Sequence, residues 1–89
     1  MRLLLAEDEK SLSHALCSIL EDNGYSVDAV YDGQDAIDFA SNDIYDMMIL
    51  DIMLPKKNGF DVLKEIRAAS NMIPVLVLSA RSSVDDRVR

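Results

Sequence analysis

The stretch from Met47 to Gly59, MMILDIMLPKKNG, contains the strongest indication of the fold. It opens with the continuous apolar run 47–50, which is typical of a short strand buried on both faces of a sheet. Asp51 ends this run, and Pro55 and the pair Asn58-Gly59 then mark a loop. A buried strand followed directly by a carboxylate predicts a parallel sheet with a polar site at its edge.

Strand-like runs also lie on both sides of this stretch. Residues 3–6 and 75–78 are continuously apolar, so we expect two further buried strands. Residues 25–30 are more polar and suit a strand at the edge of the sheet.

Helices with one apolar face are expected between these strands. The apolar positions of the three helices are, in chain order, Leu12, Leu16, Ile19 and Leu20, then Ala36, Ile37 and Ala40, then Phe60, Leu63 and Ile66. Asn23-Gly24 ends the first helix, and Asp32-Gly33 opens the second. Alternating strands and helices predict an α/β fold with a parallel sheet, helices on both faces and right-handed crossovers.

Composition limits the classes of function. The chain has 89 residues, a length that suits one domain. Its formal net charge of −7 argues against binding of a nucleic-acid backbone by this chain alone. The single cysteine, Cys17, cannot form an internal disulfide, so we expect a reducing, cytoplasmic environment. No apolar run approaches the roughly 20 residues of a membrane span, so no membrane partner is expected.

Polar side chains follow three of the expected strands. Glu7 and Asp8 follow the first, Asp51 the third and Ser79 the fourth. The carboxyl ends of neighbouring parallel strands meet at one edge, so these side chains should converge there. Clustered carboxylates repel one another unless a cation binds, and an all-oxygen donor set favours Mg²⁺. Beside Mg²⁺, Asp51 could attack a phosphoryl group, and Ser79 could donate a hydrogen bond to a phosphoryl oxygen.

Each of these residues also has an ordinary explanation. Glu7-Asp8 could simply complement the positive end of a helix, Asp51 could cap a loop, and Ser79 could be a turn hydroxyl. Their joint arrival at one edge favours the metal site. His14 is expected on the helix surface and Cys17 in packing, and Lys56-Lys57 is expected to be a solvated loop charge.

Several motifs together resemble the receiver domain of two-component response regulators, most closely the OmpR/PhoB type. They are LLLAEDE at 3–9, YDGQDA at 31–36, ILDIMLP at 49–55, NG at 58–59 and PVLVLSA at 74–80. The resemblance implies a flavodoxin-like sheet, Mg²⁺ as cofactor and a sensor histidine kinase as phosphoryl donor.

The resemblance also implies roles for individual residues. These are Asp51 as phospho-acceptor, Asp8, Asp51 and the Met53 backbone carbonyl as Mg²⁺ ligands, Glu7 as a contact through water, Ser79 as the switch hydroxyl, and Ala80 as the small residue beside the phosphate. In the family, phosphorylation of this aspartate controls a transcriptional output.

The family's pattern continues past residue 89, with most of a fourth helix, a fifth strand carrying a lysine, and a fifth helix. We therefore expect residues 1–89 to form one truncated receiver domain with strand order 2-1-3-4. DNA would be contacted only through a domain outside this sequence. The uncharged edge of the strand at 75–78 is expected to promote self-association.

Two alternatives stay open at this point. One is an inactive, self-associating fragment with a vestigial metal site. The other is a Mg²⁺-dependent phosphatase with an aspartyl nucleophile, although Met53 stands where a haloacid-dehalogenase-type site needs a second aspartate. The preferred interpretation is a phospho-accepting signalling domain that is not an enzyme acting on free substrates.

Overall fold

The computed structural model of the chain describes residues 1–78. In this part, strands and helices alternate: β1 Arg2–Ala6, α1 Lys10–Asp22, β2 Ser26–Val30, α2 Gly33–Ala40, β3 Met47–Asp51, α3 Gly59–Ala68 and β4 Val75–Leu78. The strands form one parallel sheet in the order β2-β1-β3-β4. The sequence-based prediction of the fold class and of this strand order is therefore confirmed.

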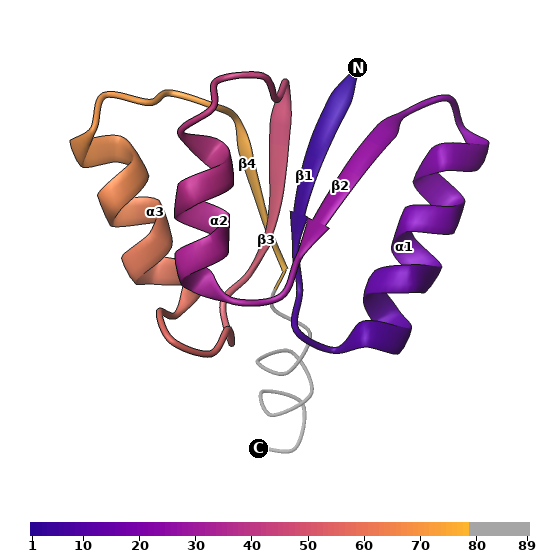
Figure 1. The fold of residues 1–89 in the computed structure, drawn as a ribbon, viewed down its shortest axis with the longest axis horizontal. Coiled ribbons are helices and arrows are strands. Elements are labelled where there is room, and N and C mark those ends of the chain that lie inside the picture. The colour runs from indigo at the N-terminus through magenta and orange to yellow at the C-terminus, as the bar shows by residue number, and fades with distance from the viewer. Residues whose placement is uncertain (79–89) are drawn as a thin grey trace, which may run out of the picture.

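The sheet lies between two helical layers. Figure 1 shows α1 on one face and α2 with α3 on the other. Alternate residues of β1 serve the two faces: Leu4 belongs to the cluster under α2 and α3, whereas Leu3 and Leu5 belong to the cluster under α1. This division explains why β1 is apolar at successive positions rather than at every second one.

Side-chain caps fix where the helices begin. The Glu9 carboxylate accepts a hydrogen bond from the Leu12 amide at 2.6 Å at the start of α1. Asp32 caps α2 and Asn58 caps α3 in the same way. Gly24, with φ +93°, turns the chain from the end of α1 into β2.

The predicted apolar face of α1 is partly wrong. Leu12 and Ile19 are 42% and 58% exposed. The positions that face the sheet are Ser13, Leu16, Cys17 and Leu20. The buried face is thus rotated from the predicted one, with the small Ser13 side chain fully buried near the first turn.

A similar difference occurs in α3. Phe60 was expected in the core but is 64% exposed, and Val62 is fully buried instead. Ile66 is buried and Leu63 is partly buried, as expected. A helix with apolar residues at 60, 62, 63 and 66 has two possible faces, and the sequence pattern alone does not choose between them.

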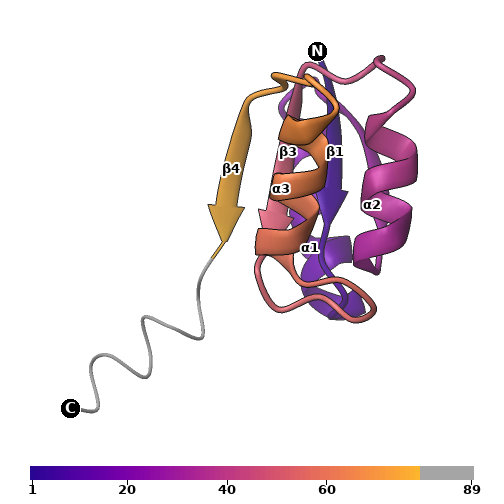
Figure 2. The same ribbon diagram turned by 90° about the vertical axis from the view of Figure 1, so that its left-hand side faces the viewer.

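The side chains of β4 are not buried on both faces, contrary to the prediction of a buried strand, whereas its position at the edge of the sheet agrees with the predicted order 2-1-3-4. It pairs with β3 only, within the described residues, and Figure 2 shows it as the outermost strand. Leu76 and Val77, which point to opposite faces, are 49% and 40% exposed. Among residues 1–78, no helix is both long enough and apolar enough to cross a membrane.

Candidate functional site

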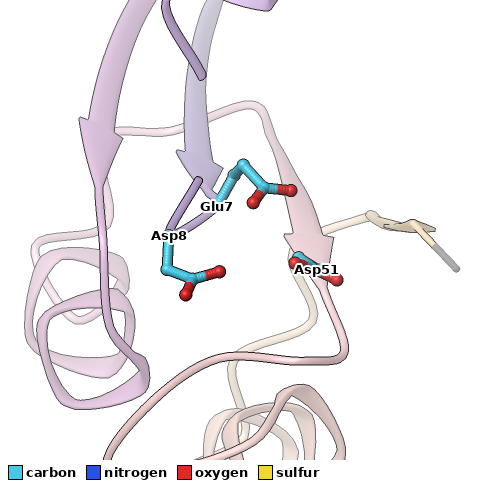
Figure 3. Close-up of side chains that lie close together, drawn as sticks. All are labelled: Glu7, Asp8 and Asp51. Carbon is cyan, nitrogen blue, oxygen red and sulfur yellow. The ribbon is translucent and has the colours of Figure 1, made fainter. Parts of the chain in front are cut away.

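Three carboxylates meet at the carboxyl end of the sheet. Glu7 and Asp8 directly follow β1, and Asp51 is the last residue of β3. Because β1 and β3 are neighbours, with Ala6 opposite Leu50, these residues leave the sheet at the same point. One carboxylate oxygen from each lies within 4.8 Å of the other two, and Figure 3 shows them gathered between the two strand ends.

Glu7 has the most unfavourable surroundings for a charge. It is only 3% exposed, and burial raises the pKa of its carboxyl above the ordinary value of 4.5. The negative charges of Asp51 and Asp8 raise this pKa further, whereas the hydrogen bond from the Glu9 amide, at 2.8 Å, acts in the opposite direction. A cation bound between these groups would favour the ionised form of Glu7.

Asp8 supplies an oxygen that has no protein partner. Its Oδ1 atom is buried, and among residues 1–78 no donor lies within hydrogen-bonding distance of it. A buried carboxylate oxygen without a partner is costly in free energy. Binding a metal ion would satisfy this atom, so the donor set fits an oxygen-liganded cation.

Asp51 is half-buried at the end of β3, with one carboxylate oxygen engaged by the chain itself. Its Oδ1 accepts a hydrogen bond from the Met53 amide at 3.1 Å. A carboxylate can accept several hydrogen bonds or metal bonds, so this contact orients the side chain while capacity remains for a ligand. Met53 lies in the loop 52–58, and its side chain is exposed.

The glycine at the start of α3 brings that helix close to the site. A Cβ atom at Gly59 would lie 2.6 Å from both the Asp51 carbonyl oxygen and Ile52 Cα. The Gly59 amide donates to the Ile52 carbonyl at 2.7 Å, and the buried Leu54 side chain joins the core under α2 and α3. The loop after Asp51 therefore has fixed contacts on its inner side.

The structure brings together the three acids that the sequence placed at one edge: Glu7, Asp8 and Asp51. Ser79 and Ala80, the other two predicted site residues, lie outside the described residues. Met53 occupies the loop beside Asp51, as its position in the sequence requires.

The other residues considered in the sequence analysis lie on the surface, pack inside the fold or form ion pairs. His14 is exposed on α1, and burial raises the pKa of the half-buried Cys17 thiol, which fits a packing role. Lys56 lies 3.5 Å from Asp32, and Lys57 forms an ion pair with Glu65. The contact between Lys56 and Asp32 was not expected from the sequence, in which the pair Asp32-Gly33 indicated only the start of a helix.

The donors of this site are all hard oxygen atoms, and no histidine or cysteine side chain belongs to the acidic cluster. Such a set favours Mg²⁺ or Ca²⁺ over softer metals. With few protein ligands, Mg²⁺ is the better fit, because it keeps several waters and binds together with phosphate.

Comparison with known proteins gives one family. The family model of the response regulator receiver domain matches residues 3–89. The transcriptional regulatory protein DltR of Streptococcus agalactiae is 47% identical over 88 residues, which is 99% of this chain and 39% of DltR. The transcriptional regulatory protein TctD of Salmonella typhimurium is 44% identical over 89 residues, or 40% of its own length. The chain thus spans well under half the length of these curated relatives.

Solved structures agree with this result. The receiver domain of the Pseudomonas aeruginosa sensor histidine kinase PA1611, which has a magnesium ion coordinated in its active-site cleft, superposes with a TM-score of 0.88. It is 32% identical, and the match covers 99% of this chain and 74% of that one. The receiver domain of the Francisella response regulator 1452 gives a TM-score of 0.87 at 29% identity, over 98% of this chain and 72% of that one.

Proposed function

Since the chain belongs to the response regulator receiver family, we propose that it accepts a phosphoryl group on Asp51 with the help of Mg²⁺. The observation that carries the proposal is the convergence of Glu7, Asp8 and Asp51 at one strand edge. The magnesium ion coordinated in the PA1611 receiver domain supports the choice of metal.

Each residue of the site would have a distinct role. Asp8, Asp51 and the Met53 carbonyl would hold the ion directly, and Glu7 would contact it through water. When bound, Mg²⁺ would neutralise negative charge on the incoming phosphoryl group. An Asp51 oxygen would form a bond to phosphorus while the bond from phosphorus to the donor nitrogen breaks, and the departing imidazole would take a proton from water. Ser79 and Ala80 are proposed as the switch hydroxyl and the small residue beside the phosphate.

We propose a sensor histidine kinase as the donor and the cytoplasm as the compartment. DltR and TctD are transcriptional regulators of which this chain matches 39% and 40%, which supports a transcriptional output exerted by another part of a longer protein. DNA would be contacted by that part. A phosphatase acting on free substrates is less well supported, because Met53 occupies the position where such a site needs a second acid.

Labelling with a small phosphodonor tests the proposal. The chain is incubated with acetyl phosphate in Mg²⁺ or in EDTA, and intact mass spectrometry counts the added phosphoryl groups. We expect one acid-stable, base-labile group that requires Mg²⁺ and is lost in Asp51→Asn. Asp22→Asn, at the exposed end of α1, is the matched control and should be labelled normally. Labelling that persists in Asp51→Asn or in EDTA would reject the proposal.

We also propose that a second copy of the chain pairs with the outer edge of β4. Residues 75–78 carry no charge, and Leu76 and Val77 are about half exposed. A two-fold axis would place two β4 strands antiparallel and pair backbone groups that have no partner strand within residues 1–78. Light scattering during size exclusion should show a dimer that Leu76→Lys converts to a monomer, with Ser26→Lys on the opposite edge strand as control. A monomeric wild-type chain at tens of micromolar would contradict it.

A further inference from the structure

The first residues of α2 lie against the loop 52–58, which carries Met53. Figure 1 shows the start of α2 and this loop at the same end of the sheet. The Gly33 amide donates to the Pro55 carbonyl at 3.0 Å, and the same carbonyl accepts the Lys57 amide at 2.8 Å. One backbone oxygen thus joins a tight turn of the loop to the start of a helix that precedes it by some twenty positions in the chain.

The approach at this contact is so close that only glycine fits. A Cβ atom on Gly33 would lie 2.0 Å from the Lys57 carbonyl oxygen and 2.7 Å from Lys57 Cβ. The nearest obstacle is backbone, which cannot move aside as the end of a flexible side chain can. Gly33 is also buried, so the loop and the helix start touch without intervening solvent at this residue.

Asp32 adds a second connection beside the first. Its Oδ1 caps α2 by accepting the Asp35 amide at 2.8 Å, while its Oδ2 lies 3.5 Å from the Lys56 ammonium. The pKa of the Asp32 carboxyl is below its ordinary value, mainly because of the Asp35 N–H and also because of Lys56. Lys56 itself has φ +68°, in the left-handed region that a lysine rarely adopts, so contacts around it must hold this turn in place.

The loop is therefore anchored on both sides of Met53. Before Met53, the Ile52 carbonyl accepts the Gly59 amide at 2.7 Å. After it, the buried Leu54 and the contact of Pro55 with Gly33 hold the chain. Met53 has an exposed side chain, so its backbone position depends on these anchors and on the hydrogen bond that its amide donates to Asp51 Oδ1.

We infer that Asp32 and Gly33 are positioning residues for the magnesium site: they hold the loop 52–58, and with it the Met53 backbone, in the position that metal binding requires. The inference rests on the proposed function, because it takes the Met53 carbonyl as a metal ligand. Outer contacts that fix a metal ligand commonly change metal affinity by about 10-fold or more when they are removed.

Substitution at Gly33 tests this role. Mg²⁺ is titrated into isotope-labelled wild-type chain and into Gly33→Ala, and the backbone amide signals of residues 51–54 are followed by nuclear magnetic resonance. We expect Gly33→Ala to shift these signals before metal is added and to weaken Mg²⁺ binding about 10-fold. Gly24→Ala is the control, because it strains a left-handed turn in open space at the other end of the sheet. It should lose stability but keep its Mg²⁺ affinity.

The outcomes separate the inference from the proposed function. A wild-type chain that binds no Mg²⁺ would overturn the proposed function and the inference with it. Normal binding by wild type together with unchanged affinity in Gly33→Ala would overturn only the inference. Equal loss of affinity in Gly24→Ala would do the same, because general destabilisation would then explain both.

A second pair of variants covers the case in which Gly33→Ala does not fold. Asp32→Asn keeps a good helix cap but loses the attraction to Lys56. Asp35→Asn removes the same charge from an exposed position of α2, and within residues 1–78 the ion pair of Lys56 is with Asp32 rather than Asp35. We expect Asp32→Asn to bind Mg²⁺ about threefold more weakly than Asp35→Asn, the size expected for one exposed ion pair. Equal affinities in these two variants would contradict the positioning role.

Discussion

Glu7 has a carboxyl group that loses its proton less readily in the metal-free folded chain than an ordinary glutamate does. Its pKa is raised above the ordinary 4.5 by burial and by the neighbouring charges of Asp51 and Asp8. The folded state therefore binds this proton more tightly than the unfolded state does. Glu7 contributes most favourably to stability when the pH is below 4.5, and this contribution is lost as the pH rises through the raised value.

We predict that Glu7→Gln stabilises the metal-free protein at neutral pH. Glutamine keeps the oxygen that accepts the Glu9 amide but has no charge to bury. The gain should disappear in acid, where Glu7 is already neutral. Thermal unfolding in EDTA across a range of pH measures it.

The same substitution should weaken Mg²⁺ binding, so stability and affinity would move in opposite directions. Glu9→Gln, at the exposed cap of α1, is the comparison for the loss of one negative charge. Equal stability of Glu7→Gln and wild type in EDTA at neutral pH would show that the buried charge costs little.

At the residue scale, the sequence was sufficient to find the acids and insufficient to describe their surroundings. Glu7, Asp8 and Asp51 could be identified because each follows an apolar strand directly, and parallel strands bring such positions together. The contact between Gly33 and Pro55 could not be identified in this way, because it joins two loops through backbone atoms. A pattern of side chains in the sequence does not predict a close approach between two backbone segments.

Among the elements, α3 begins where the chain has no room for a side chain. Glycine at an ordinary helix start is usually a weak point, and replacing it with alanine usually stabilises the protein. We predict the opposite for Gly59→Ala, because its Cβ would lie 2.6 Å from the backbone of Asp51 and Ile52. The loss should be about 1–3 kcal/mol, as for other overpacked sites.

Chemical denaturation of Gly59→Ala measures this loss. Ser11→Ala, at an exposed position in the first turn of α1, is the control and should leave stability nearly unchanged or raise it slightly. A gain in stability for Gly59→Ala would mean that the end of β3 can move away from α3 at little cost.

A polar cluster closes the end of the sheet opposite the acidic site. The Tyr45 hydroxyl donates to Asp28 Oδ2 at 2.6 Å, and Arg2 contacts the same oxygen at 2.9 Å. The pKa of the Asp28 carboxyl is therefore lowered, mainly by the Tyr45 hydroxyl, and that of Tyr45 is raised to about 12 by burial and by Asp28. The cluster ties β1, β2 and the segment before β3 together.

We predict that Tyr45→Phe lowers stability by about 1 kcal/mol at neutral pH, the size of one hydrogen bond to a charged group at a partly exposed position. A lowered carboxyl pKa contributes stability above the ordinary value of 3.8, and this contribution is lost as the pH falls. The difference between wild type and Tyr45→Phe should therefore shrink in acid. Tyr25→Phe is the control, because the Tyr25 hydroxyl makes no hydrogen bond within residues 1–78, and an equal loss of stability in both variants would contradict the prediction.

At the scale of elements, the sequence predicted which segments are helices and strands better than it predicted their orientation. In α1 the leucines and isoleucine at 12, 16, 19 and 20 suggested one face, but the sheet contacts Ser13 and Cys17 instead of Leu12 and Ile19. The sequence pattern reports only which side chains are apolar, whereas burial also depends on which side chains fit the space between the helix and the sheet. The small Ser13 side chain fits that space, but because serine is not apolar, a hydrophobic pattern does not predict its burial.

Across the whole molecule, the order of the strands decides where the acids meet. The polar character of residues 25–30 predicted that β2 lies at an edge, whereas the full order 2-1-3-4 was implied only by the resemblance to the receiver family. The exposure of β4 was harder to predict, because a continuous apolar run is typical of a strand with neighbours on both sides.

Binding of Mg²⁺ should raise the stability of the whole domain. An ion that binds the folded chain and not the unfolded one adds about 2.7 kcal/mol when its free concentration is about 100 times the Kd. We predict a higher Tm in Mg²⁺ than in NaCl at the same ionic strength, and no such gain in Asp8→Asn. Asp22→Asn should retain the gain, and equal Tm values in both salts would show that the site does not bind the ion tightly.

The acidic site and the Tyr45 cluster lie at opposite ends of the sheet, with the chain passing between them along every strand. The segment that joins α2 to β3 is exposed at residues 41–44, and Figure 1 shows it at the end of the sheet away from the carboxyl ends of β1 and β3. Exposed turns of this kind tolerate foreign sequence well. A fluorescent reporter inserted into this turn would therefore leave the acidic site at the opposite end of the sheet intact.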